Sequence, residues 1–203
     1  MILRREFYAR PTLDVARDLI GKVVVHDGAA GRTSGVIVET EAYIGEGDPA
    51  CHAAPGPTPR NEPLYGPPGY AYVYFNYGMH HLFNAVTEPA GSPAAVLIRA
   101  LAPLDGLDVM RRRRVRGTGR RAGDLDEAAV CRGPGNLTRA LAIGASQNRT
   151  DLTHGPLVIE DRGFDLGQIA WSPRIGIRVG TDRAWRVYVP GHPAVSGPPA
   201  LRR

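Results

Sequence analysis

The segment Val-Ile-Val-Glu-Thr-Glu-Ala-Tyr, residues 36–43, limits what this chain can fold into more than any other part of it. Half of its residues are β-branched, and such residues favour a strand over a helix. Because alternate side chains of a strand share a face, the odd-numbered residues from Ile37 to Tyr43 are expected on one face and the even-numbered residues on the other. The sequence therefore predicts a strand that is apolar on both faces and carries two carboxylates, Glu39 and Glu41, on one of them.

Two interpretations of this glutamate pair fit the pattern. The first is an edge strand on which both glutamates are solvated. The second is a buried strand, in which a carboxylate beside aromatic groups acquires a pKa suited to general-base work. A glutamate is rarely buried without a partner, and Arg99 lies inside the apolar run of residues 95–101, where a guanidinium needs an anion. Glu39 or Glu41 is the expected partner of Arg99.

The fold class follows from the chain length and the order of the elements. A chain of 203 residues can bury one sizeable core, so we expect a single domain over residues 1–203. Hairpins without a regular strand–helix–strand rhythm favour an α+β domain with a curved, mainly antiparallel β-sheet and surrounding helices. The expected helices cover residues 12–20, with Thr12 as the N-cap, 103–113 and 134–143, and the expected strands cover 22–26, 36–43, 70–75, 82–86, 94–101, 174–179 and 185–189.

A long segment rich in proline and glycine, residues 45–69, follows the glutamate strand. We expect it to be an irregular loop, and loops of this length inside a compact domain are usually functional. It contains His52, for which the sequence alone leaves two interpretations open, an ordinary surface histidine or a residue of a binding site.

Tyrosines are concentrated in the predicted hairpin. Tyr70, Tyr72 and Tyr74 share one face of a strand, where they either pack in the core or form a platform for a flat ring. Tyr77 differs, because it lies in the predicted turn Asn-Tyr-Gly, where there is little core to enter. An exposed aromatic side chain at that position is suited to act as a wedge between base pairs, as apolar side chains do when they kink DNA.

Arginine carries almost all of the positive charge. The formal net charge is +5, and Lys22 is the only lysine. Guanidinium groups suit phosphates. The arginine-rich stretch from Arg111 to Arg121 is compatible with phosphate contacts, and equally with a solvated face or a flexible loop. The predicted helix start at residues 133–136 offers backbone N–H groups to an anion.

Several classes of protein are excluded by features that the sequence lacks. It has no run of about 18 apolar residues and no secretory signal, so we expect a soluble, cytoplasmic protein without a membrane partner. Cys51 and Cys131 have no zinc-site spacing and the histidines form no ligand pattern, so we expect no metal and no cofactor. A monomer is expected, since no coiled-coil pattern or long apolar stripe is present.

In these motifs the chain resembles the alkyladenine (3-methyladenine) DNA glycosylase family. The resemblance spans nearly the whole chain and does not depend on one motif. It is carried by residues 38–43, His52, residues 58–61, 72–74 and 77–79, and it continues through Asn84 and residues 97–101, 133–134, 141–143, 174–176 and 188–189.

The resemblance implies a monofunctional DNA glycosylase of base excision repair. Such an enzyme binds double-stranded DNA, flips out an alkylated or deaminated purine such as 3-methyladenine, hypoxanthine or ethenoadenine, and hydrolyses its N-glycosidic bond, which leaves an abasic site. It needs no cofactor and no protein partner, and in a bacterium it would act at the nucleoid. The implied fold is one compact α+β domain with a protruding β-hairpin that inserts into DNA.

Individual residues take roles from the same resemblance. Glu41 would be the general base that activates water, and Arg99 with the backbone carbonyl of Ile175 would hold that water. The stretch of residues 111–127 and the loop of residues 54–68 match no family pattern, so their roles stay open, as does the preferred lesion. The walls of the base pocket would be Tyr43, His52 and Tyr74. Asn84 would be the selectivity filter at the base edge, and Tyr77 would be the wedge that fills the gap in the duplex.

Two other functions stay open at this point. A glycosidase could use Glu39 and Glu41, whose Cα atoms would lie about 6 to 7 Å apart on one strand, although two such carboxylates cannot readily flank both faces of a sugar. A non-catalytic DNA- or RNA-binding module could use the tyrosines for stacking and the arginines for phosphates. Strand-cleaving lyase activity is not expected, because it requires an amine that forms a Schiff base and the chain has only Lys22.

Overall fold

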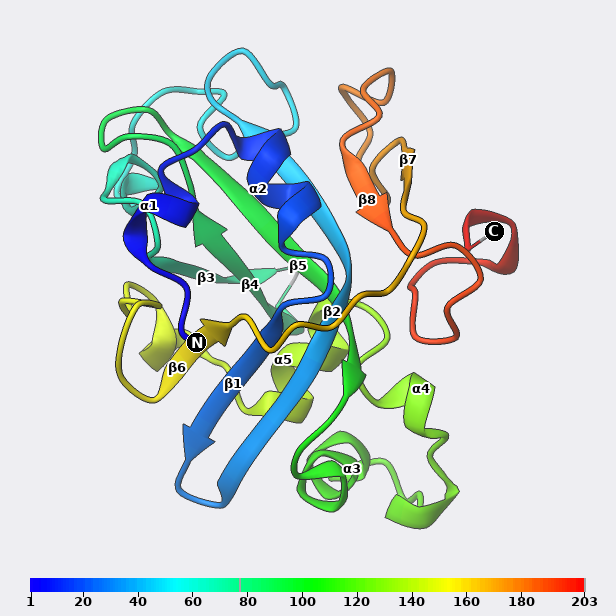
Figure 1. Cartoon of the computed structure of the whole chain (residues 1–203). Coiled ribbons are helices and arrows are strands. Elements are labelled where there is room, and N and C mark those ends of the chain that lie inside the picture. Colours follow the sequence, from blue (N-terminus) through cyan, green and yellow to red (C-terminus); the bar gives the residue numbers. More distant parts are fainter. Residues whose placement is uncertain (77, 203) are drawn as a thin grey trace.

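The computed structural model (Figure 1) describes residues 1–76 and 78–202. Its strands are β1 (Val23–Gly28), β2 (Gly31–Ile44), β3 (Ala71–Asn76), β4 (His80–Val86), β5 (Ala94–Pro103), β6 (Leu157–Glu160), β7 (Ala170–Ser172) and β8 (Arg186–Tyr188). Its α-helices are α1 (Arg5–Tyr8), α2 (Thr12–Asp18), α3 (Leu107–Val115), α4 (Glu127–Val130) and α5 (Pro134–Leu141). Its short 3₁₀ helices are η1 (Glu62–Tyr65), η2 (Ala122–Asp124), η3 (Ala145–Gln147) and η4 (Pro199–Leu201).

The named strands form one antiparallel sheet in the order β3-β4-β5-β2-β1-β6, with β8 paired to β2 and β7 paired to β8. The prediction of an α+β domain with a curved, mainly antiparallel sheet is confirmed (Figure 1). β2 has partners on both edges, since β5 pairs with one edge and β1 and β8 pair with the other. The interpretation of β2 as an edge strand with solvated glutamates is therefore wrong, and Glu39 and Glu41 are completely buried.

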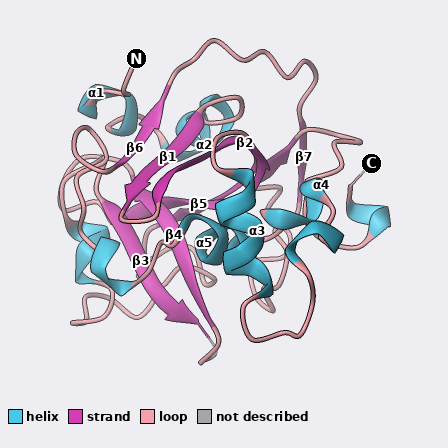
Figure 2. Ribbon diagram, turned by 90° about the horizontal axis from the view of Figure 1, so that it is seen from below, coloured by secondary structure: helices cyan, strands magenta, loops and turns pink. Residues whose placement is uncertain are grey.

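The sheet curls around the main hydrophobic core, and helices close that core. α2 packs against β2, β5 and β8. α5 packs against β4 and β5 and buries Leu137, Ala140 and Leu141, whose spacing places them on one face of the helix. α3, α4 and α5 lie together on one side of the sheet (Figure 2). The other face of β2 and β5 is left for the side chains of the candidate site.

A paired irregularity interrupts the β2–β5 ladder beside the glutamates. Glu39 lies opposite Ala100, but the register shifts by one residue on either side, which leaves Val38 on β2 and Arg99 on β5 as the extra residues. Ile37 consequently packs in the main core, on the face opposite the glutamates. The predicted alternation holds from Glu39 to Tyr43 and is wrong for Ile37, because a bulge reverses which residues face the core.

Two predicted helix starts differ from the structure. Thr12 is the first residue of α2 rather than its cap, and its hydroxyl forms a hydrogen bond to Glu88 at 2.8 Å, which connects the helix to a distant turn. Pro103 ends β5, and α3 begins only at Leu107. Gly106 before it has φ +76°, and a Cβ there would collide with the carbonyl oxygen of Arg32, so this turn requires glycine.

The predicted strand over residues 174–179 does not form. The backbone of Ile175 bonds to side chains instead, because its N–H donates to Glu41 at 2.6 Å and its carbonyl oxygen accepts from Arg99 at 3.4 Å. Both backbone groups of Ile175 are thus bonded to side chains rather than to a neighbouring strand.

β3 and β4 form the predicted hairpin, with Ala71 opposite Ala85 and Asn76 opposite His80. Phe75 and Met79, near its turn, are 51% and 69% exposed. Tyr77 lies outside the described residues, so the insertion of this hairpin into DNA stays a prediction.

The arginine-rich stretch is partly tied into the fold. The guanidinium groups of Arg111, Arg113 and Arg114 donate to backbone carbonyl oxygens at 2.8 to 3.2 Å, which ties α3 to the helices around it. Burial lowers the pKa of Arg113 and Arg114. The hypothesis of phosphate contacts is therefore restricted to the exposed members of the stretch, Arg112, Arg116, Arg120 and Arg121.

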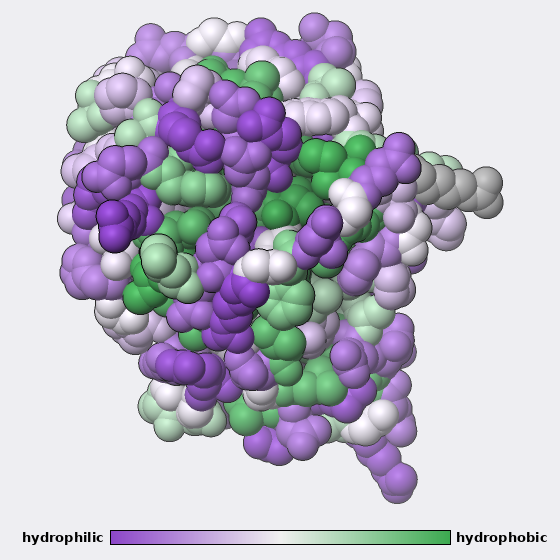
Figure 3. Space-filling view, viewed as in Figure 1, coloured by the Kyte–Doolittle hydropathy of each residue, from purple (hydrophilic) through white to green (hydrophobic). Residues whose placement is uncertain are grey.

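Polar residues dominate the surface in Figure 3, where hydrophobic residues appear as separate patches. Among the residues that the structure describes, no helix is both long enough and apolar enough to cross a membrane.

Candidate active site

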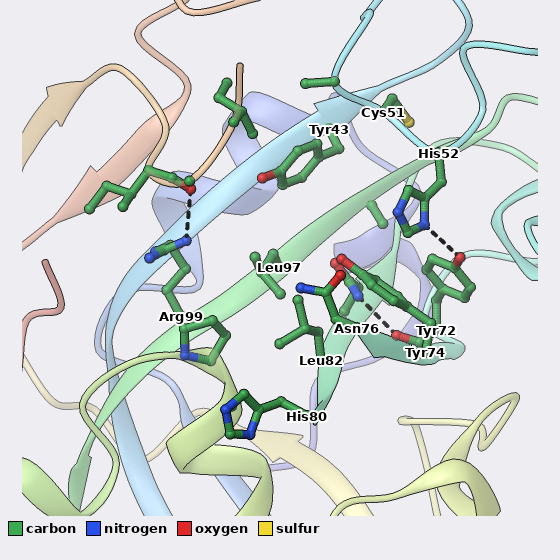
Figure 4. Close-up of a pocket in the computed structure, with 18 of the residues that line it drawn as sticks. Tyr43, Cys51, His52, Tyr72, Tyr74, Asn76, His80, Leu82, Leu97 and Arg99 are labelled. Carbon is green, nitrogen blue, oxygen red and sulfur yellow. Dashed lines mark hydrogen bonds between the residues drawn. The ribbon is translucent and has the colours of Figure 1, made fainter. Parts of the chain in front are cut away.

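A pocket of about 640 Å³ opens beside the glutamate strand, on the face of β2 and β5 away from the main core. Its volume is in the range of small-molecule sites. Side chains from β2, β3, β4 and β5 line it (Figure 4), together with residues of the loop before η1, the start of α5 and the segment after Arg174. The long loop of residues 45–69 thus forms one wall, through Ala50, Cys51, His52 and Leu64.

Aromatic side chains form two opposing walls of the pocket. Tyr43 projects from β2 on one side, and His52 with Tyr74 lies on the other (Figure 4). The rings of His52 and Tyr74 are 4.4 Å apart between centroids, and those of Tyr72 and Tyr74 are 5.2 Å apart. Planar apolar surfaces on two sides of a cavity are suited to a flat ring system.

His52 is held in place by its neighbours. Its Nδ1 is 2.8 Å from the hydroxyl of Tyr72, and its backbone carbonyl accepts from the amide of Asn61 at 2.7 Å. Burial lowers the pKa of His52, and the positive charge of Arg60 lowers it further. At neutral pH the imidazole is therefore uncharged. A neutral ring can stack on a cationic ligand without repelling it.

β4 and β5 add three apolar side chains and one amide to the pocket lining. Leu82, Ala95 and Leu97 supply the apolar part, and Asn84 supplies the amide. The NH2 group of Asn84 donates to the backbone carbonyl of Tyr72 at 3.0 Å. In this orientation its carbonyl oxygen is the group that can accept a hydrogen bond from a ligand.

Glu41 is fully buried behind the pocket wall and receives three hydrogen bonds. Its Oε2 accepts from the hydroxyl of Tyr43 at 2.9 Å and from Arg99 at 3.1 Å, and its Oε1 accepts from the N–H of Ile175 at 2.6 Å. Burial and the Glu41 carboxylate raise the pKa of Tyr43, so its hydroxyl stays protonated and donates. All three donors line the pocket, so the carboxylate lies directly behind that surface.

Glu39 lies on the side of Arg99 away from the pocket. Its oxygens accept from Arg99 at 3.2 Å, from Arg186 at 2.6 Å and from the N–H of Ser196 at 2.7 Å. Burial alone would raise the pKa of Glu39, but the charges of Arg99 and Arg186 outweigh it and lower the pKa. Two carboxylates and two guanidiniums thus form a buried cluster. The sequence predicts Glu39 or Glu41 as the partner of Arg99, and in the structure Arg99 pairs with both.

The structure brings seven of the predicted site residues together. Tyr43, His52, Tyr74, Asn84, Arg99 and Ile175 line the pocket, and Glu41 lies behind them. Tyr77, the eighth, lies outside the described residues. No cluster of three or more His, Cys, Asp or Glu side chains suited to a metal ion occurs within residues 1–76 and 78–202.

Sequence reasoning missed several residues that shape this site. Arg186 and the N–H of Ser196 donate the remaining hydrogen bonds to Glu39, and Asp48 pairs with Arg174 behind Tyr43. Cys51 lines the pocket as a free thiol, and burial raises its pKa. An arginine inside an apolar run, as Arg186 is in residues 184–189, was the one available signal.

The fold and the site together define an α+β domain with an aromatic-walled pocket for a planar ring beside a buried carboxylate. Comparison with known families identifies it further. The family model described as "Methylpurine-DNA glycosylase (MPG)" matches residues 6–193. The chain belongs to the methylpurine-DNA glycosylase family.

Individual relatives extend the match over almost the whole chain. A protein of Chlorobaculum tepidum is 44% identical, with 99% of this chain and 95% of the relative aligned. A protein of Burkholderia lata is 48% identical, with coverage of 99% and 94%. A protein of Methanocella arvoryzae is 46% identical, with coverage of 96% for both chains. All three carry the name "Putative 3-methyladenine DNA glycosylase".

Proposed function

We propose that this protein is a monofunctional DNA glycosylase that flips a damaged purine into the pocket and hydrolyses its N-glycosidic bond with a water activated by Glu41. The observation that carries the proposal is the position of Glu41, fully buried and hydrogen-bonded to Tyr43, Arg99 and Ile175 directly behind an aromatic pocket. Membership of the methylpurine-DNA glycosylase family supports the DNA substrate.

The chemistry requires an activated water on one side of the sugar and a leaving base on the other. Positive charge builds on the sugar as the bond breaks, so a nearby carboxylate both stabilises that charge and accepts the proton of the water. The carbonyl oxygen of Ile175 and the guanidinium of Arg99, 3.4 Å apart, offer an acceptor and donors to this water beside Glu41. Arg99 also remains paired with Glu39, which keeps its guanidinium in place.

Base selection rests on stacking and on one hydrogen bond at the base edge. An alkylated purine with a positive charge leaves readily and gains roughly 0.5 to 2 kcal/mol from cation–π contact with an aromatic face. Tyr43, His52 and Tyr74 provide such faces. The carbonyl oxygen of Asn84 favours bases that present a donor to it, which is the basis of its proposed role as a filter.

Base flipping costs a few kcal/mol, and less for a damaged or mispaired base. We assign Tyr77 to the gap left in the duplex on the strength of the sequence resemblance, since in the sequence it falls between the residues of β3 and those of β4. Tyr74, one of the base-stacking side chains, lies on β3 of the same hairpin, whereas Tyr43 lies on β2 and His52 in the long loop.

The two other functions are less well supported by the contacts. A glycosidase would need both carboxylates at the substrate, whereas Glu39 lies behind Arg99 and its oxygens are occupied. A lyase would need an amine near the pocket, whereas Lys22 pairs with Asp161 at 2.6 Å and is not among the pocket residues. A pure binding module would not require a buried, hydrogen-bonded carboxylate at its pocket.

Release of a damaged base tests the proposal directly. Under single-turnover conditions, duplexes with 7-methylguanine, hypoxanthine or ethenoadenine should lose that base and leave an intact abasic strand, which hot alkali then cleaves. Enzyme-dependent strand breaks before alkali would contradict the monofunctional mechanism. Tight duplex binding without release of any of these bases would favour a binding module.

The charge of His52 predicts a pH dependence that differs between lesions. Because the pKa of His52 lies below its ordinary value, the ring is neutral at pH 7 and becomes an imidazolium as the pH falls through that lowered pKa. Release of cationic 7-methylguanine should then decrease several-fold more than release of neutral hypoxanthine. Taking the ratio of the two rates removes effects common to both lesions, such as protonation of carboxylates.

Arg60→Ala provides the matched variant for this pH profile. Arg60 is exposed and its charge lowers the pKa of His52, so its removal should move the decrease in the ratio to higher pH. A lesion ratio that stays constant from pH 5 to 8 in both proteins would exclude a charge-dependent role of His52.

A further inference from the structure

Arg174 and Asp48 form an ion pair whose two side chains are completely buried. One guanidinium nitrogen donates to Asp48 at 2.5 Å and to the carbonyl of Ala42 at 2.9 Å, and the other donates to Asp48 at 2.7 Å. This fork geometry is the most specific way in which arginine binds a carboxylate. Replacement of such a pair by apolar residues is often neutral or stabilising, so stability alone does not account for it.

The guanidinium of Arg174 also stacks on aromatic rings. Its central carbon is 4.6 Å from the ring centre of Tyr43 and 5.1 Å from that of Trp185. Tyr43 therefore has a planar, immobilised group on one face of its ring, while the tyrosine also forms a wall of the pocket. Because Asp48 pairs with this guanidinium, its contribution to the pocket wall is geometric; Arg183 also contacts Asp48, at 3.7 Å.

Arg174 also directly precedes Ile175, the residue whose backbone contacts both Glu41 and Arg99. The N–H of Ile175 donates to Glu41 at 2.6 Å, and its carbonyl accepts from Arg99 at 3.4 Å. Residues 174–179 lack the support of a neighbouring strand, so the position of this peptide depends on side-chain contacts. The Arg174 side chain connects it to Asp48 and to the backbone of β2 at Ala42.

We propose that Arg174 and Asp48 are positioning residues that fix the Tyr43 ring and the Ile175 peptide relative to each other, so that the stacked base and the activated water are aligned. The inference rests on the proposed function and extends it to residues that do not touch the substrate. Misplacement of reacting groups by about 1 Å can cost on the order of a hundredfold in rate.

Arg174→Lys and Asp48→Asn test the proposal. Lysine keeps the charge but loses the fork and the planar stacking surface, and asparagine keeps the shape of aspartate but removes its charge. The matched control is Arg5→Lys, because Arg5 also pairs with an aspartate, Asp151, and lies 5.1 Å from the ring of Tyr70, none of which lines the pocket.

Two measurements are made on each variant. The first is the single-turnover release rate at saturating enzyme, corrected for the folded fraction, on a hypoxanthine duplex. The second is the fluorescence quenching of ethenoadenine in a duplex, measured in a Glu41→Gln background. We expect both site variants to lose at least tenfold in rate and most of the quenching, with undamaged-duplex affinity within twofold of wild type and Arg5→Lys unchanged in both measurements.

Lower thermal stability with an unchanged rate and unchanged quenching would overturn the proposal, as would equal losses in Arg5→Lys. Asp48→Asn replaces Arg174→Lys as the decisive variant if the latter does not fold. If the wild type releases no base, the proposed function fails, and the quenching comparison still decides whether Arg174 and Asp48 position the Tyr43 wall.

Discussion

Glu41→Gln is expected to lower single-turnover release of a damaged base by a factor on the order of 10² to 10⁴, the usual contribution of a general base. The amide cannot accept a proton from water, but it has the size of the carboxylate. Its oxygen can still accept from Ile175 or Arg99, and the hydroxyl of Tyr43, which now donates to Glu41, can turn and accept from the amide. The variant should therefore fold and bind damaged duplex as the wild type does.

A second glutamate serves as the control for this substitution. Glu62 lies in the same long loop as His52 but is exposed and pairs with Arg149 on the surface. Glu62→Gln should release bases at the rate of the wild type. If Glu41→Gln retains more than a tenth of the wild-type rate, another group activates the water. If it loses duplex binding as well, Glu41 has a structural role that the rate alone does not reveal.

Arg99→Met is expected to have the largest effect on stability. Among the residues that the structure describes, Arg99 is the one cationic partner of Glu41 and one of two cationic partners of Glu39. Its removal leaves both carboxylates fully buried. Breaking a buried pair in this way costs about 3 to 5 kcal/mol. In a chain of this length that corresponds to a melting temperature lower by roughly 6 to 20 °C.

A double variant separates the charge effect from lost packing. Arg99→Met/Glu41→Gln removes one positive and one negative charge, so it should be more stable than Arg99→Met alone. Arg32→Met, which removes an exposed partner of Asp27, should leave the melting temperature almost unchanged. Equal melting temperatures for Arg99→Met and the double variant would show that the buried charge of Glu41 is not what destabilises the protein.

The sequence predicts the residues that line the pocket better than the residues and the strand register that hold them in place. A strand with two carboxylates, a hairpin with tyrosines on one face and an arginine in an apolar run are local patterns, and the structure contains each of them. The bulge at Val38 and Arg99 depends on the register between β2 and β5, which no local pattern encodes. Ile37 was therefore assigned to the wrong face.

Contacts between residues that are distant in the sequence are the second feature of the site that could not be predicted. Asp48 and Arg174 are 126 positions apart, and each on its own is an ordinary charged residue in a loop. The segment after Arg174 alternates like a strand, yet its backbone bonds to Glu41 and Arg99, a choice set by tertiary contacts rather than by propensity. The roles of the site residues rest on the resemblance and stay predictions until the variants are measured.

Completion of the Glu39–Glu41 cluster depends on residues that are synthesised long after the two glutamates. The N–H groups of Ile175 and Ser196 reach Glu41 and Glu39 across 134 and 157 positions. At translation rates of about 5 to 20 residues per second, the two glutamates wait on the order of ten seconds for these partners. A ribosome-bound chain that ends before residue 175 therefore has neither N–H donor, and the cluster is complete only after residue 196 has been added.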